Sequence, residues 1–318
     1  MSHDPRPVRA HRRRSVPTLL ALVVVLAVAL PGVPASAADP YTPIGRTPFR
    51  EGSGVVASRA YPGVYWSHQD AGGGTRNVLY AFKVSDGRLV DLIPGVKFRR
   101  IRLPGLVNRD WEDIAIDGGY LWLGDIGNNG DCTRTDLAVH KIREPDPYRA
   151  TSASVVATYP FVWPDVTASR CTGRNAESLV VLDGKPYLIS KSRPPGLYRF
   201  STLSTSSRNL LKKLGTLTPP AGGFAKPATG ADLSMDGGRL AVSTAAYNLY
   251  VYKTSNAGLR GEALLLDLIS RPPAAKQQYR RDGGNEQVEG VAFVRGRHDI
   301  VLLSEARKIL YFPVGFYD

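Results

Sequence analysis

Residues 111–125, WEDIAIDGGYLWLGD, contain two short apolar runs, at 114–116 and 121–123, which are separated by the turn sequence at 117–119. Short apolar runs between turn residues are typical of β-strands, and the chain beyond its N-terminus has almost no helical periodicity. The same pattern occurs in five copies. Their first strands are predicted at residues 54–57, 113–116, 178–181, 232–235 and 290–293, so that successive starts lie 59, 65, 54 and 58 residues apart.

Each copy continues into further predicted strands. Second strands are predicted at 64–66, 120–123, 186–189, 239–242 and 300–303, and third strands at 79–82, 137–140, 197–200, 249–252 and 310–312. A fourth strand is predicted in the first four copies, for example at 88–92 and 262–266. Repeated units of four antiparallel strands are typical of a β-propeller, whose blades pack against their neighbours. We therefore predict an all-β fold with one propeller of five blades; six blades are the alternative.

The last copy has only three predicted strands before Asp318. A three-stranded last blade would leave an open sheet edge, which favours aggregation. We therefore expect the N-terminal segment at 44–49 to supply the missing outer strand and to close the ring.

The N-terminus has the three parts of a signal peptide at residues 1–37. Five arginines precede an apolar run at 19–30, and Ala35 and Ala37 provide the small residues of a cleavage site before Ala38. The apolar run is shorter than the roughly 20 residues of a membrane-spanning helix, and no later segment is long and apolar enough to span. We predict a secreted, extracellular protein with one domain at 38–318, exported by the secretory or the twin-arginine route.

The chain is basic, with 41 Lys and Arg against 28 Asp and Glu and a formal net charge of +13. The basic residues of the mature chain are scattered, and no basic helix, aromatic-interleaved stripe or nucleic-acid motif accompanies them. This pattern favours a solvated surface over a nucleic-acid partner and leaves a cell-surface polyanion as the alternative.

Two cysteines, Cys132 and Cys171, belong to the mature chain. An even number of cysteines in an exported protein favours a disulfide over a metal site or a nucleophile. We predict a structural Cys132–Cys171 disulfide, which would close a loop of about 40 residues and stabilise the fold by about 3 to 4 kcal/mol.

Acidic residues gather where the first predicted strands begin and the second ones end. In a propeller these ends meet at one mouth of the central channel. The starts carry Asp110, Glu112, Asp113, Glu177, Asp232 and Glu289, and the ends carry His68, Gln69, Asp70, Asp125, Asn128, Asn129, Lys191 and Glu305. Carboxylates so close repel one another unless they are protonated, paired with a cation or bound to a metal.

Oxygen donors without a Cys or His cluster suit calcium or magnesium better than zinc. We predict a divalent-cation site, with calcium favoured. Its ligands are drawn from Glu112, Asp113, Glu177, Asp232 and Glu289. The structural alternative is that these acids accept hydrogen bonds from backbone amides at the narrow centre of the propeller.

Several motifs of the chain resemble secreted bacterial β-propellers of the phytase-like esterase type. They are WSHQD at 66–70, DWEDIA at 110–115, GDIGNN at 124–129, AESL at 176–179, TGADLS at 229–234 and VEGVA at 288–292. The resemblance covers roughly residues 53–305 and implies a propeller fold and export. Gln69 and Asn129 stand where Asn and Asp are expected in such motifs, which lowers the metal affinity that the resemblance implies.

Two functions fit these residues. The first is a calcium-dependent hydrolase of phosphate or carboxyl esters, in which His68, Asp70 or Asp125 activates water beside the metal. The alternative is a non-catalytic extracellular propeller that binds a ligand or a protein at the same mouth. In both cases we expect a monomer with a small-molecule or cell-surface ligand at the channel mouth.

Overall fold

The structure is a computed structural model that describes residues 1, 41–70, 77–129, 133–164, 174–279 and 287–317. The chain separates into two units, Met1–Ala38 and Asp39–Asp318. The predicted signal peptide, apart from Met1, and both cysteines of the predicted disulfide lie outside the described residues. No helix among the described residues has the length and apolar character that crossing a membrane requires.

The second unit is all-β and propeller-like, with one short α-helix. Its strands are β1 (Thr42–Arg46), β2 (Gly52–Ala57), β3 (Val64–Gln69), β4 (Val78–Ser85), β5 (Arg88–Val90), β6 (Phe98–Arg102), β7 (Trp111–Asp117), β8 (Tyr120–Asp125), β9 (Ala138–Arg143), β10 (Val155–Val162), β11 (Ala176–Leu182), β12 (Lys185–Ser190), β13 (Gly196–Phe200), β14 (Asn209–Thr216), β15 (Ala228–Leu233), β16 (Arg239–Thr244), β17 (Asn248–Lys253), β18 (Ala275–Gln278), β19 (Val288–Phe293), β20 (Ile300–Ser304) and β21 (Lys308–Phe312). The helix α1 spans Gly261–Ile269, and the 3-10 helix η1 spans Val314–Phe316.

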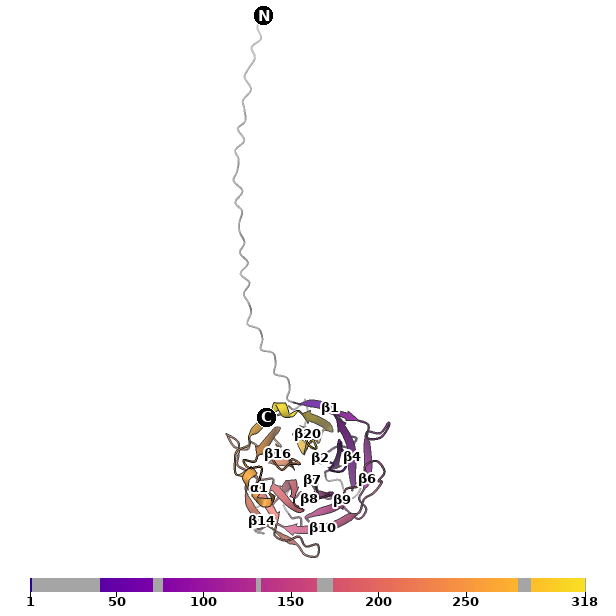
Figure 1. Ribbon diagram of the computed structural model, residues 1–318, viewed down its shortest axis with the longest axis vertical. Coiled ribbons are helices and arrows are strands. Elements are labelled where there is room, and N and C mark those ends of the chain that lie inside the picture. Colours follow the sequence, from indigo (N-terminus) through magenta and orange to yellow (C-terminus); the bar gives the residue numbers. More distant parts are fainter. Residues whose placement is uncertain (2–40, 71–76, 130–132, 165–173, 280–286, 318) are drawn as a thin grey trace. The chain divides into compact units, whose positions relative to one another are not determined.

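The strands form antiparallel sheets of order β2-β3-β4-β5, β15-β16-β17-β18 and β1-β21-β20-β19, with β6 also paired to β4. An eight-stranded sheet, β11-β12-β13-β14-β10-β9-β8-β7, joins two antiparallel halves through β10 and β14. These two strands pair in parallel over only two residue pairs, Phe161 with Asn209 and Val162 with Leu210. The sheets surround a central axis, with β2 and β7 near the middle and β6, β10 and β14 toward the rim (Figure 1).

The strands that begin each repeat close a ring around this axis. β2 lies against β7, β7 against β11, β11 against β15, β15 against β19, and β19 against β2. The N-terminal strand β1 pairs antiparallel with β21. This is the closing role that the sequence predicted for residues 44–49, although the strand lies slightly earlier in the chain.

The hydrophobic core lies between neighbouring sheets rather than in one centre. Trp66 and Trp111, for example, are fully buried in a cluster that joins the sheet of β2 to that of β7. A second cluster around Trp122 and Leu188 joins β8 to β12. Each sheet therefore buries both faces against neighbours, as the repeat pattern predicts.

One predicted fourth strand is wrong, and another is confirmed only in part. Residues 262–266 belong to helix α1, whose buried residues Leu264, Leu265, Leu268 and Ile269 recur at helical spacing, and the outer strand here is β18. Residues 88–92 contain only the short β5, whereas β6 pairs with most of β4.

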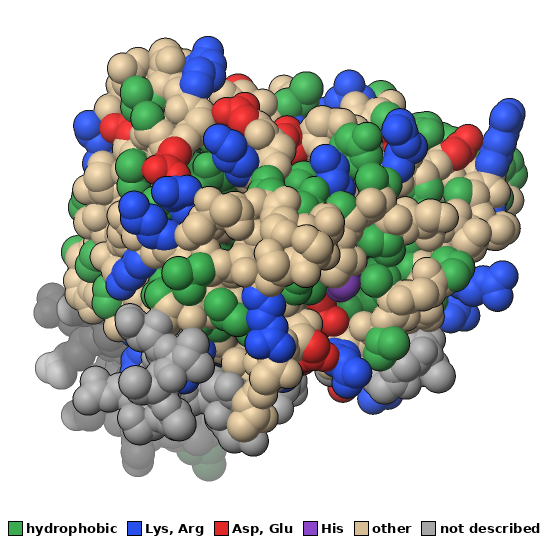
Figure 2. Space-filling model, turned by 90° about the horizontal axis from the view of Figure 1, so that it is seen from below, with side chains coloured by type: hydrophobic (Ala, Val, Ile, Leu, Met, Phe, Trp, Pro, Cys, Tyr) green, Lys and Arg blue, Asp and Glu red, His purple; other side chains and the backbone are tan. Residues whose placement is uncertain are grey.

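Basic side chains do not form a stripe on the face shown in Figure 2, where Lys and Arg are dispersed among other residues. This distribution matches the solvated surface expected from the sequence.

A buried histidine makes stability depend on pH. His140 on β9 lies opposite Thr158, its Nδ1 is 2.9 Å from Thr158 Oγ1, and burial lowers its pKa to about 4. A lowered folded-state pKa gives stability that is present above pH 6.5 and lost as the pH falls through about 4. Relative to the His140→Gln variant, the wild-type free energy of unfolding should fall by about 3 kcal/mol between pH 7 and pH 4. Urea unfolding of both proteins at several pH values measures this difference, and parallel pH curves would contradict it.

Candidate functional site

The five ring strands share a β-bulge at the same position. The register shifts between Ser53 and Val55, Trp111 and Asp113, Ala176 and Ser178, Ala228 and Gly230, and Val288 and Gly290. The extra residue at each bulge is Gly54, Glu112, Glu177, Thr229 or Glu289. A bulge bends a strand and re-aims a side chain. Three of the five bulges carry a glutamate; we call Glu112, Glu177 and Glu289 the bulge glutamates.

Each bulge glutamate is buried, with 2 to 4% of its surface exposed. Each has one carboxylate oxygen with no hydrogen-bond partner among the described residues: Glu112 Oε1, Glu177 Oε2 and Glu289 Oε2. A buried charged oxygen without a partner is costly and is normally paired with a proton donor or a cation. These oxygens therefore indicate a site that receives a positively charged or hydrogen-bonding group.

Glu112 belongs to a tight cluster that we call the acidic triad. It consists of Asp70, which follows β3, Asp110, which precedes β7, and Glu112, and one ligand atom from each lies within 4.8 Å of the others. Gly127 packs directly against this cluster. A Cβ atom on Gly127 would overlap Asp110 Oδ2 and Glu112 Oε1, so a larger residue here would force these carboxylates to shift.

Electrostatics in the mouth disfavour the ionised carboxylates. Burial raises the pKa of Glu112 well above its usual range, and the charges of Asp70, Glu289 and Asp110 raise it further, whereas Lys191 lowers it. Burial and Glu305 likewise raise the pKa of Glu289, against a hydrogen bond of 2.7 Å that Gln287 Nε2 donates to Glu289 Oε1. A bound cation would reverse these shifts because it favours the charged form.

Asp113 and Asp232, which the sequence grouped with the metal ligands, hold backbone amides instead. Asp113 accepts hydrogen bonds from the N–H groups of Ile114 (2.9 Å), Leu179 (2.8 Å) and Ala231 (3.4 Å). Asp232 accepts from Leu233 (2.9 Å) and Phe293 (2.8 Å), and burial raises its pKa to about 7. Both carboxylates thus join ring strands to one another through backbone amides, and neither belongs to the acidic triad.

The three residues expected to activate water have different surroundings. His68 is fully buried, its Nδ1 lies 3.0 Å from the Gln69 carbonyl, and burial lowers its pKa to about 4. His68 is therefore neutral near pH 7. Asp70, which is half-buried, is the one of the three that lies in the triad.

Asp125 is buried and paired with an arginine. Its Oδ1 is 2.7 Å from Arg134 Nη2 and accepts a hydrogen bond of 3.2 Å from the N–H of Asp110. Burial raises the pKa of Asp125, and Arg134 opposes the rise. Asp125 thus positions the backbone of the triad residue Asp110.

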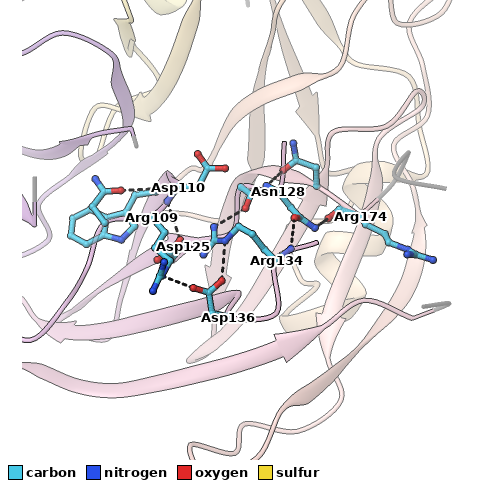
Figure 3. Close-up of polar contacts among 11 residues, drawn as sticks. Arg109, Asp110, Asp125, Asn128, Arg134, Asp136 and Arg174 are labelled. Carbon is cyan, nitrogen blue, oxygen red and sulfur yellow. Dashed lines mark hydrogen bonds and ion pairs between the residues drawn. The ribbon is translucent and has the colours of Figure 1, made fainter. Parts of the chain in front are cut away.

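Arg134 organises the turn beside the triad (Figure 3). Besides Asp125, it donates to the Gly127 carbonyl (2.7 Å) and pairs with Asp136 (3.0 Å), which also pairs with Arg109 (2.6 Å). Arg134 was not predictable from the sequence, because it lies in a turn without periodicity. Its position nine residues after Asp125 is a spacing that carries no recognisable motif.

Glu177, Lys191 and Asn129 form a second, partly neutralised group at the mouth. Glu177 Oε1 forms an ion pair with Lys191 Nζ, and Asn129 Oδ1 lies 3.5 Å from the same ammonium. The structure thus brings Asp70, Asp110 and Glu112 together on one side of the mouth and pairs Glu177 with a lysine.

No protein-family model matches the sequence, and no curated protein matches it. Among solved structures, the chain is similar to the crystal structure of glutaminyl cyclase from Myxococcus xanthus. The two share 12% sequence identity over 85% of this chain and 94% of that chain, with a TM-score of 0.49.

Proposed function

We propose that this protein is an exported β-propeller of five blades that binds a divalent cation, calcium, at the acidic triad. The observation that carries the proposal is Glu112 Oε1. This oxygen is buried, has no hydrogen-bond partner among the described residues, and belongs to a carboxylate that meets those of Asp70 and Asp110 within 4.8 Å. Each ring strand begins one blade. The eight-stranded sheet therefore forms two blades, and β1 completes the last blade.

The chemistry of the triad favours calcium. Its donors are carboxylate oxygens, which suit calcium and magnesium, and it contains neither the Cys nor the His that zinc sites use. Calcium accepts six to eight oxygen ligands in flexible geometry, so water or ligand oxygens can complete its coordination. A doubly charged cation also offsets the repulsion among Glu112, Asp70, Asp110 and Glu289.

We assign hydrolysis of a phosphate or carboxyl ester as the activity, with an extracellular small molecule or cell-surface group as substrate. A cation at the triad supplies a Lewis acid for a phosphoryl or acyl oxygen. Asp70 is the predicted water-activating residue that remains at the triad, and its half-buried position leaves it accessible from the mouth. The resemblance of residues 53–305 to phytase-like esterases points the same way.

A non-catalytic binding propeller is the second candidate, and one observation favours it. Two of the three groups expected to activate water are committed elsewhere, since His68 is buried and neutral and Asp125 pairs with Arg134. In that case the triad and its cation would hold a ligand without turning it over.

Calcium titration by calorimetry, followed by phosphatase, esterase and lactonase assays with calcium or with chelator, tests the proposal. We expect calcium binding and an ester hydrolysis that chelator abolishes and Asp70→Asn reduces at least tenfold. Binding without hydrolysis of any ester class would support the second candidate. Absence of calcium binding would contradict the cation site itself.

A further inference from the structure

Lys191 lies at the mouth, and its positive charge acts on two of the bulge glutamates, Glu112 and Glu177. It directly follows β12, and its backbone N–H donates to the Asn175 carbonyl at 2.8 Å. Its ammonium forms an ion pair with Glu177 Oε1, where the Glu177 side chain is 3% exposed and that of Lys191 is 27% exposed. A cation that belongs to the chain thus already occupies one side of the mouth.

Asparagine side chains link this ammonium to the turn that packs against the triad. Asn129 Oδ1 lies 3.5 Å from Lys191 Nζ and accepts a hydrogen bond of 2.8 Å from Asn175 Nδ2. Asn175 Oδ1 in turn accepts from the Asn128 N–H at 2.8 Å. The segment that carries both Asn128 and Asn129 begins at Gly127, which packs against Asp110 and Glu112.

Lys191 therefore acts on both groups of carboxylates. Its positive charge acts on Glu112, and its ammonium forms an ion pair with Glu177. The same positive charge repels a calcium ion at the triad, because like charges across a poorly solvated mouth interact strongly. The ammonium and the metal ion thus compete for the same negative charge.

We propose that Lys191 is a built-in competing cation that sets the calcium affinity of the triad and keeps a second cation away from Glu177. This inference rests on the proposed cation site and assigns its affinity to a residue that is not a metal ligand. Removing the ammonium should strengthen calcium binding by about tenfold, because the repulsion between the ammonium and the calcium ion disappears.

Replacing Lys191 and replacing Glu177 should change the calcium affinity in opposite directions. This difference distinguishes a competing-cation role of Lys191 from a structural role of the ion pair. Calcium chloride is titrated calorimetrically into the wild type, Lys191→Gln, Glu177→Gln and Lys191→Arg. We expect Lys191→Gln to bind about tenfold more tightly, Glu177→Gln to bind more weakly, and Lys191→Arg to stay within about threefold of the wild type. Loss of a merely structural ion pair would change the affinity of both Gln variants in the same direction.

Each outcome decides one of the two proposals. If the wild type binds calcium and Lys191→Gln binds equally or more weakly, the competing-cation role is wrong and the cation site stands. If only Lys191→Gln binds calcium, the competition is supported and the cation site of the wild type is wrong. If neither protein binds calcium, both proposals are wrong.

Discussion

Replacing Glu112 by Gln is expected to remove the stabilisation of this protein by calcium. A ligand present at 100 times its dissociation constant adds about 2.7 kcal/mol to the free energy of unfolding. For a domain of this size, that corresponds to a rise in the melting temperature of roughly 5 to 10 °C in the wild type. Glu112→Gln keeps the side-chain shape but removes the charge of the carboxylate whose Oε1 lacks a partner, so its melting temperature should respond little to calcium.

The protein with the higher melting temperature should be a different one in chelator than in calcium. Burial and the charges of Asp70, Glu289 and Asp110 raise the pKa of Glu112, so its ionised form is unfavourable without a cation. Glu112→Gln should therefore melt at or above the wild-type temperature in chelator and below it in calcium. Thermal melts of both proteins under both conditions measure this crossing, and a wild type that shows no calcium shift would exclude the metal.

Glu144→Gln is the matched control. Glu144 Oε1 accepts hydrogen bonds from Ser58 Oγ and from Trp66 Nε1, the latter at 2.9 Å, and Glu144 is not part of the triad. The substitution is chemically the same, but it should lower the melting temperature equally in calcium and in chelator. An equal loss of the calcium response in Glu144→Gln would show that the response reflects general destabilisation.

The strand pattern was predictable because it is local. Apolar runs such as 114–116 and 121–123, with glycine turns between them, specify strands and a hairpin without information from distant residues. The unpaired edge of the last repeat correctly predicted an N-terminal strand, now β1 beside β21. Helix α1 was missed because the run of leucines at 264–266 has no polar alternation, so a short strand and a buried helix look alike.

The site was predictable only in part, because a β-bulge leaves no signature in the apolar pattern. The sequence placed Asp232 in register with Asp113, whereas the bulge in β15 puts Gly230 at the position of Asp113. Asp232 consequently lies two residues further along the strand. There it accepts a hydrogen bond from the Phe293 N–H and does not belong to the acidic group at the mouth. The sequence predicted Glu112, Asp70 and Asp110 at the mouth, but it did not predict that these three lie together, because they come from segments that flank strands of different sheets.

Replacing Asp113 by Ala is expected to cause the largest loss of stability among these variants, about 3 to 5 kcal/mol. The Asp113 carboxylate is fully buried and accepts from three backbone N–H groups, those of Ile114, Leu179 and Ala231. Alanine leaves all three donors without an acceptor on three different ring strands, and a buried donor without a partner costs about 1 to 3 kcal/mol. Urea unfolding at constant pH measures the loss.

Asp117→Ala provides the comparison within the same strand. Asp117 Oδ2 accepts one N–H, that of Gly184 at 2.7 Å, and its side chain is only part-buried, so its removal should cost about 1 kcal/mol. The Asp113→Ala loss should be the same in calcium and in chelator, and the folded variant should bind calcium within about twofold of the wild type. If Asp113→Ala instead stays stable in chelator and loses calcium binding, Asp113 is a metal ligand, as the sequence alone predicted, and its three amide bonds are secondary to that role.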